Sequence, residues 1–155
     1  MKIYLMRHGE ASFDAATDRQ RPLTELGKRQ SKEVAEQFML AMERVDLVLL
    51  SPYLRTRQTW GAIEALCKAS PPVELLDELV PEANPAMARD LLIAQAEVAQ
   101  AEHVLVISHM PLLGYLLAEL VPGQEPSLFA TSGIAQIAML QQPQLECRVS
   151  PQLQI

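Results

Sequence analysis

Short, continuous apolar runs recur along the chain, and each is separated from the next by a segment with helical spacing. The most strand-like run is Val104–Ser108, which reads Val-Leu-Val-Ile-Ser. Continuous apolar runs indicate strands that are buried on both faces, as in a parallel sheet, because a solvent-exposed face would need polar residues at alternate positions. Further strands are expected at Lys2–Met6, Asp46–Leu50, Val73–Leu75, Gly133–Leu140 and Leu145–Val149. The last two are expected to pair as a terminal hairpin.

The segments between these runs predict helices. Thr24–Met42 starts with a residue suited to N-capping and repeats apolar residues at roughly helical spacing. Three more helices are expected at Leu54–Lys68, Ala86–Ala99 and Leu112–Leu120. Strands interleaved with helices predict an α/β fold with a mostly parallel sheet that helices cover on both faces. No internal repeat or linker divides the chain, so residues 1–155 are expected to form a single domain.

Composition excludes several classes of protein. The net charge of −6 and the pI of about 5.0 disfavour a nucleic-acid partner, because such domains usually carry a basic face. Cys67 and Cys147 stand in no CxxC spacing, so we expect reduced thiols in a cytoplasmic protein rather than a disulfide framework or a zinc site. The longest apolar stretch, Met110–Val121, contains Glu119 and is too short to span a bilayer. No membrane association is expected.

Unusual polar residues follow three of the expected strands. Arg7, His8 and Gly9 follow the first, Arg55 comes shortly after the second, and His109 follows Val104–Ser108. Ligands of parallel sheets bind at the carboxyl ends of the strands, so these residues are expected to converge at one edge. Arginine supplies a planar fork suited to phosphate oxygens, and glycine lets the backbone approach a ligand closely. The pattern predicts a phosphate site.

A histidine at this edge favours phosphoryl transfer. A neutral imidazole has a free lone pair near pH 7, and its attack on phosphorus would give a phosphohistidine that water can discharge. Arg7 and Arg55 suit the charge on the phosphoryl oxygens, and His109 could add a donor. The chain has three histidines and no HxH or HExxH spacing, so neither a metal nor another cofactor is expected.

Several polar residues have simpler interpretations. His103 precedes a strand and carries no motif, so it is expected to be a solvated loop residue. Arg57 is expected to be a surface charge. Ser51 and Ser108 lie in no GxSxG sequence, which argues against a serine nucleophile.

The motifs together resemble those of the histidine phosphatase (phosphoglycerate mutase-like) superfamily. The matching runs are Arg7-His8-Gly9-Glu10, Ser51-Pro52-x-x-Arg55-x-x-Gln58-Thr59 and Ser108-His109. The short chain and the runs 18–24 and 107–112 are similar, more closely, to the SixA-type phosphohistidine phosphatases.

The resemblance implies a three-layer α/β/α sandwich and assigns a role to each matching residue. It implies that His8 is the nucleophile and that Arg7, Arg55 and His109 form the phosphate pocket. Arg21 near the mouth would bind substrate, with Asp18 as its partner. An ordinary surface ion pair between Asp18 and Arg21 is an equally good reading.

One departure from the family bears on the substrate. Larger members carry a glutamate after the third strand that protonates an alcohol leaving group. Here Pro81 falls at that place, and neither Glu78 nor Glu82 aligns with it. A phosphorylated imidazole needs less help to leave than an alkoxide, because its nitrogen can be protonated near neutral pH.

We therefore expect a cofactor-independent phosphatase that acts on a histidine-phosphorylated protein and releases phosphate ion. The partner would be a phosphotransfer domain or a phosphocarrier, and the enzyme is expected to be a monomer. The alternatives are a small-molecule phosphomonoesterase of the same superfamily and a non-catalytic module that binds phosphoproteins.

Overall fold

Six strands form one mixed sheet in the computed structural model, which describes residues 1–152. The strands are β1 (Lys2–Arg7), β2 (Leu47–Leu50), β3 (Val73–Leu75), β4 (His103–Ser108), β5 (Ile134–Ala138) and β6 (Gln144–Val149). Their order across the sheet is β3-β2-β4-β1-β5-β6. The first four strands along the chain are parallel, whereas β5 runs antiparallel to β1 and β6 antiparallel to β5. The predicted mostly parallel sheet and its terminal hairpin are confirmed.

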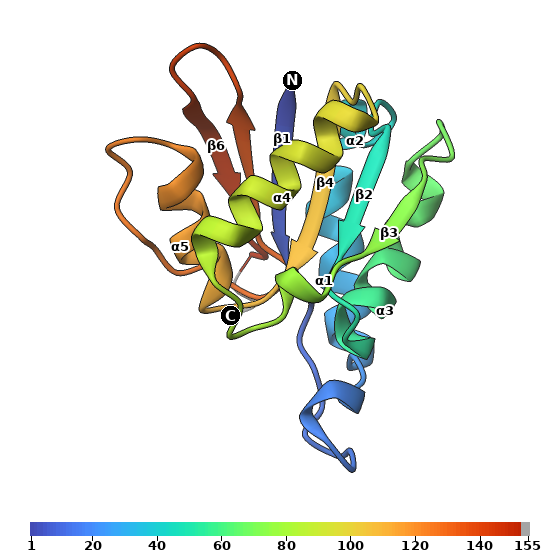
Figure 1. The fold of residues 1–155 in the computed structure, drawn as a ribbon. Coiled ribbons are helices and arrows are strands. Elements are labelled where there is room, and N and C mark those ends of the chain that lie inside the picture. The colour runs from blue at the N-terminus through green and yellow to red at the C-terminus, as the bar shows by residue number, and fades with distance from the viewer. Residues whose placement is uncertain (153–155) are drawn as a thin grey trace.

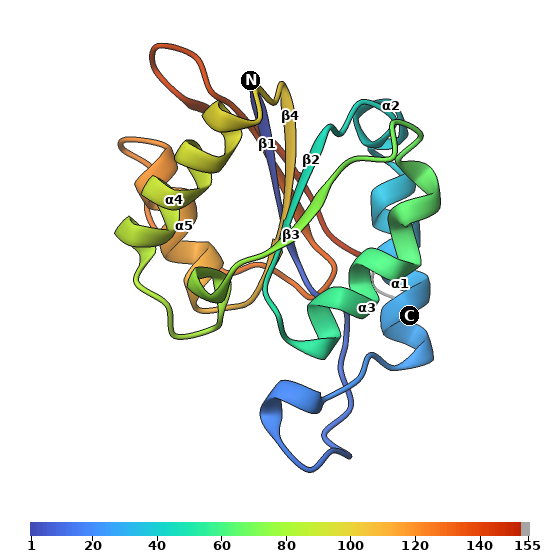
Figure 2. The same ribbon diagram turned by 45° about the vertical axis from the view of Figure 1, so that its right-hand side comes forward.

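Helices cover both faces of this sheet, as the edge-on view in Figure 2 shows. On one face lie α1 (Glu25–Glu36), α2 (Met39–Met42) and α3 (Leu54–Ile63), and on the other lie α4 (Pro85–Val98) and α5 (Leu112–Leu120) (Figures 1 and 2). Three short 3₁₀ helices complete the set: η1 (Asp18–Gln20), η2 (Glu64–Leu66) and η3 (Asp77–Leu79). The fold is the expected three-layer α/β/α sandwich.

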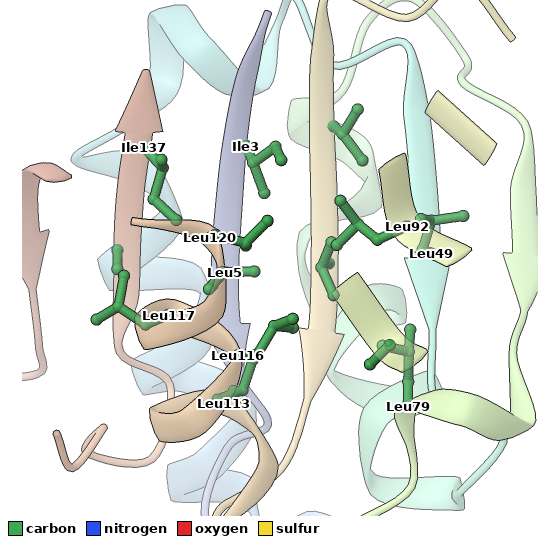
Figure 3. Packing of buried hydrophobic residues seen from close by; sticks show 14 of the residues in the cluster. Ile3, Leu5, Leu49, Leu79, Leu92, Leu113, Leu116, Leu117, Leu120 and Ile137 are labelled. Carbon is green, nitrogen blue, oxygen red and sulfur yellow. The ribbon is translucent and has the colours of Figure 1, made fainter. Parts of the chain in front are cut away.

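The continuous apolar pattern of the central strands follows from this double covering. In β1, Ile3 and Leu5 pack into the cluster under α4 and α5, whereas Tyr4 and Met6 pack into the cluster under α1 and α3. Leu116 and other leucines of α5 lie over Ile3 and Leu5 in Figure 3. Both faces of β1 are therefore desolvated, and its position in the sheet is fixed up to Arg7, the last residue of the strand.

Three local predictions are wrong, and in one of them the expected helix Leu54–Lys68 ends at Ile63, where η2 follows. The expected helix Thr24–Met42 breaks after Glu36, and Phe38 leaves the helical dihedrals so that its buried ring packs edge-on against Tyr4, with 6.4 Å between centroids. His103 is the first residue of β4 and is part-buried instead of a solvated loop residue. Its Nδ1 lies 3.0 Å from the Tyr4 hydroxyl, which gives the imidazole a partner from the neighbouring strand. None of the helices within residues 1–152 has the length and apolarity needed to cross a membrane.

Candidate active site

The parallel strands deliver the predicted residues to one edge of the sheet, at the lower end of the strands in Figure 1. Arg7 ends β1 in register with Ser108, which ends β4. His8 and His109 follow these two residues directly, and their ring centroids lie 5.2 Å apart. Arg55, in the first turn of α3, places its Nε 3.4 Å from His8 Nε2. The structure thus brings together four side chains, some of which the sequence places more than a hundred residues apart.

His8 has one unprotonated ring nitrogen, Nε2, which accepts a long hydrogen bond from Arg55 Nε at 3.4 Å. Its Nδ1 donates a hydrogen bond to the Gly9 carbonyl oxygen at 2.7 Å, and since a carbonyl only accepts, the proton sits on Nδ1. Nε2 therefore carries the lone pair, on the side of Arg55. Burial, together with the charges of Arg55 and Arg7, lowers the pKa of His8 to about 4, although the bond to Gly9 opposes the shift. The imidazole is neutral at pH 7 and can act as a nucleophile.

His109 is the second histidine of the site, and its Nδ1 supplies a hydrogen-bond donor there. Its Nε2 lies 2.7 Å from Ser51 Oγ, which also accepts a hydrogen bond from the Tyr53 backbone N–H. With the Ser51 hydroxyl as the donor of this bond, Nε2 is its acceptor. The His109 proton is then on Nδ1. Burial, followed by the effect of neighbouring His8, lowers the pKa of His109 to about 2 and keeps the ring neutral.

The two arginines are held in place by main-chain oxygens. Arg7 Nη1 donates to the Phe129 carbonyl at 2.7 Å, and Arg55 Nη1 donates to the Asp18 carbonyl at 2.7 Å. Burial lowers the pKa of both guanidinium groups, yet each stays charged near neutral pH.

Two donors of the site lack protein partners. Arg7 Nε and His109 Nδ1 are the buried side-chain polar atoms without a hydrogen-bond partner in the described chain. An unpaired buried donor is costly, and the oxygens of a phosphoryl group would satisfy both. The side chains that meet here are cationic or neutral donors, a set suited to an anion. Within residues 1–152 no three His, Cys, Asp or Glu side chains group to hold a metal ion.

The segment between β1 and α1 closes over Arg55. Asp18, the first residue of η1, accepts from Arg55 Nη2 through its carboxylate at 3.3 Å as well as through its carbonyl. Arg21 donates to the backbone oxygens of Ser12 and Ala11 and to Asp18 Oδ1. Asp18 is thus more than the partner of Arg21 in a surface ion pair, because it also contacts a residue of the site. Burial disfavours the Asp18 carboxylate, but bonds to Arg21 and the charge of Arg55 outweigh this, so its pKa is lowered.

Gly9 has no room for a side chain. A Cβ built there would lie 2.6 Å from the Gly27 carbonyl oxygen and 2.8 Å from Ser31 Oγ. The Gly9 N–H also donates to Thr59 Oγ1 at 3.0 Å. The glycine therefore lets the turn after β1 pack directly against α1 and α3, which fixes the position of His8.

Gly9→Ala is expected to lower the free energy of unfolding by about 1–3 kcal/mol, because the methyl group must displace the backbone of α1. The matched control is Gly61→Ala in α3, where an added Cβ meets nothing within 4 Å. That substitution is expected to raise the free energy of unfolding by up to about 1 kcal/mol through helix propensity. Urea denaturation measures both, and equal effects of the two alanines would contradict the packing argument.

The contacts made by several residues of the site appear only in the structure, even where the residue belongs to a recognised motif, as Ser51 does. Ser51 orients His109 from 58 residues away, and only the fold shows this contact. Thr59 belongs to the recognised motif, but its bonds to Gly9 and to the Arg55 carbonyl appear only in the structure. Arg148, in β6, donates at 2.6 Å to Ser127 Oγ and to the Leu128 carbonyl, next to the residue that holds Arg7.

The two weak candidates for a general acid do not join the site by hydrogen bonds. Within residues 1–152 no hydrogen bond links Glu78 or Glu82 to His8, His109 or the two arginines. The segment that carries Glu78 and Glu82 does lie next to the end of β4, because Ser108 Oγ donates to the Leu79 carbonyl at 2.6 Å. Neither carboxyl group therefore positions the histidines or arginines of the site through a hydrogen bond.

The depressed pKa values of His8 and His109 predict a pH-dependent stability. Both groups take up a proton near pH 6.5 in the unfolded chain but only below about 4 and about 2 in the folded protein. The unfolded state therefore binds more protons below pH 6.5, and stability is lost as pH falls. Each histidine should lower the free energy of unfolding by up to about 1.4 kcal/mol per pH unit between pH 6 and 4. Urea unfolding across this range measures the slope, and an unchanged slope in His109→Gln would contradict the assignment.

Comparisons with known proteins agree with this geometry. Residues 3–81 match the model of the histidine phosphatase superfamily (branch 1). The chain is 40% identical over 139 residues to phosphohistidine phosphatase SixA of Escherichia coli K12, which covers 90% of this chain and 86% of that protein. It is 31% identical to a SixA homolog of Haemophilus influenzae, over 88% of this chain and 87% of the relative.

A solved structure of a similar protein has the same fold. The structure of the protein histidine phosphatase SixA complexed with tungstate superimposes with a TM-score of 0.89 at 37% identity. The match covers 97% of each chain.

Proposed function

This chain belongs to the histidine phosphatase superfamily, branch 1, and to its SixA group, and on that basis we propose that it is a protein-phosphohistidine phosphatase with His8 as its nucleophile. The observation that carries the proposal is the state of His8: a neutral, buried imidazole whose Nε2 lone pair lies beside Arg55. A merely structural histidine would have no need of a buried guanidinium beside its unprotonated nitrogen.

The reaction takes two displacements at phosphorus. In the first, His8 Nε2 forms a bond to phosphorus while the bond between phosphorus and the substrate imidazole breaks, and a proton from solvent neutralises the departing nitrogen. In the second, water attacks the phosphorus, phosphate ion leaves, and His8 recovers its lone pair. Arg7, Arg55 and the Nδ1–H of His109 would hold the phosphoryl oxygens in both steps.

The surroundings of the site favour a phosphohistidine over an alkyl phosphate. An alkoxide leaving group needs a positioned acid, and neither Glu78 nor Glu82 is held against the site. Protonation of the phosphoramidate nitrogen replaces that acid when the leaving group is an imidazole. The relatives named phosphohistidine phosphatase support the same substrate class.

Further properties belong to the same proposal. The substrate is a histidine-phosphorylated phosphotransfer domain or phosphocarrier protein. Arg21 and Asp18 bind or position it at the mouth of the site, and Gly9 allows its phosphoryl group to approach the backbone. Residues 1–155 act as a single domain, in the cytoplasm and as a monomer.

A substrate panel tests the proposed function. The purified protein is offered a histidine-phosphorylated phosphotransfer domain, a histidine-phosphorylated phosphocarrier, a sugar phosphate and a phosphoserine peptide, and phosphate release is measured. We expect at least one phosphohistidine protein to be hydrolysed far faster than the phosphate esters. Comparable rates on a sugar phosphate would favour the small-molecule phosphatase, and binding without turnover would favour the non-catalytic module.

A further inference from the structure

We propose that an apolar surface on the α5 side of the active site is the docking surface for the substrate protein, and that the face of that protein beside its phosphohistidine is apolar. This inference rests on the proposed function. We call the surface the apolar shelf, and it consists of Pro85, Met110, Pro111, Tyr115, Pro126 and Leu128.

Two adjoining hollows shape the shelf. One, of about 320 Å³, lies between the start of α4 and the start of α5, and the other, of about 240 Å³, lies between α5 and the segment around Leu128. Pro111 and Tyr115 line both. Glu82 is the one charged residue among their lining residues, and Tyr115 and Leu128 are 51% and 83% exposed. Contiguous apolar surface of this kind marks a binding region more often than scattered exposed residues do.

The shelf is continuous with the active site at two points. Met110 directly follows His109, the neutral donor of the site. Leu128 directly precedes Phe129, whose carbonyl oxygen accepts the hydrogen bond from Arg7. One rim of the phosphate site is therefore the inner edge of the shelf.

The depth of the nucleophile makes contact between the substrate protein and the rim of the site necessary. His8 is only 6% exposed, so a phosphoryl group must enter the site to reach its Nε2. A histidine side chain is short, and the protein that carries a phosphohistidine has to lie against the rim when its phosphoryl group is inside. A small phosphoramidate makes no such contact, which separates the two kinds of substrate.

The other rim differs in charge. There the Arg21 guanidinium lies 3.9 Å from the Phe13 ring centroid, and Arg19 lies 5.4 Å from that of Tyr53. A substrate protein would meet charged groups on this side, with the exposed Phe13 ring among them, and almost only uncharged side chains on the shelf. The contrast fixes one orientation for a partner whose phosphohistidine is flanked by an apolar face.

Tyr115→Asp tests the proposal, because it places a charge at the centre of the shelf on a side chain that belongs to neither the phosphate site nor its supports. The probes are a histidine-phosphorylated phosphotransfer domain, a histidine-phosphorylated phosphocarrier and free phosphoramidate. For the phosphoprotein that the native enzyme hydrolyses, we expect kcat/KM to fall by about tenfold or more, mainly through KM. Phosphoramidate turnover should change less than about twofold, and Tyr115→Phe should keep native values because the ring remains.

Leu40→Asp is the matched control. Leu40 is 77% exposed in α2, at the opposite end of the strands (Figures 1 and 2), and its replacement should leave both substrates unaffected. Unchanged phosphoprotein kinetics in Tyr115→Asp would overturn the docking surface, as would an equal loss on phosphoramidate. Dissociation of a native dimer by Tyr115→Asp would also overturn it, because the shelf would then bind a second copy of this chain. A native enzyme that hydrolyses phosphoramidate but neither phosphoprotein would instead contradict the proposed function itself.

Discussion

Replacement of His8 by alanine is expected to lower turnover of a phosphohistidine protein by at least about 10⁴-fold. The loss is large because the reaction is proposed to pass through a phosphoryl group bonded to His8 Nε2, and the other imidazole of the site has no nitrogen free to replace it. His109 is close, but its Nε2 is engaged by Ser51 and its Nδ1 carries a proton. Steady-state and single-turnover rates of phosphate release measure the loss.

Binding of the phosphate group should survive this change. Arg7 and Arg55 keep their main-chain partners in His8→Ala, so the affinity for a phosphate mimic such as tungstate should change only a few fold. Acid-quenched native enzyme should carry a covalent, acid-labile phosphate on His8 that the variant lacks. Loss of turnover with unchanged mimic binding separates the nucleophile from a residue that only helps to bind phosphate.

His103→Ala is the control for this experiment. His103 lies at the start of β4, at the other end of the strand from His109, and contacts Tyr4 instead of the site. Its replacement should leave turnover within about twofold of native once folding is verified by thermal unfolding. Native-like turnover in His8→Ala would end the proposed mechanism.

The parts of the site that could be predicted from the sequence are those that depend on strand ends. Arg7, His8 and His109 each stand at the end of a continuous apolar run, and the rule that parallel strands present their carboxyl ends at one edge is enough to bring them together. Arg55 follows from the same rule, because α3 starts directly after β2. The layers of the fold follow from the alternation of buried strands with helices.

The remaining features depend on contacts between distant segments. The Ser51 hydroxyl determines which nitrogen of His109 carries the proton. Asp18 holds Arg55, and it does so from a segment whose sequence shows neither helical nor strand periodicity. The position of His103 was wrongly predicted because its partner, the Tyr4 hydroxyl, belongs to another strand. The break at Phe38 has the same cause, since packing against the core overrides local helix propensity there.

Arg55→Ala is expected to lower kcat/KM for the phosphoprotein by about 10³-fold and, unlike His8→Ala, to weaken binding of tungstate as well. Arg55 is 4% exposed and donates toward both His8 and Asp18, so alanine removes a charge from the phosphate site and also leaves Asp18 without one of its partners. Arg55→Lys should recover only part of the loss, because an ammonium group keeps the charge but cannot bond a phosphoryl group as a fork.

Arg57 offers a matched control two residues further along the same helix. It is exposed, so Arg57→Ala removes the same charge from the chain without removing a donor from the site. The charge of the protein near the site falls in both variants, and any long-range effect on a negatively charged substrate should therefore appear in both and weaken with added salt. If kcat/KM and tungstate affinity fell equally in Arg55→Ala and Arg57→Ala, the role of Arg55 would be limited to long-range electrostatic attraction of the negatively charged substrate. A loss confined to Arg55→Ala and insensitive to salt would instead require direct bonds from its guanidinium to the phosphoryl group.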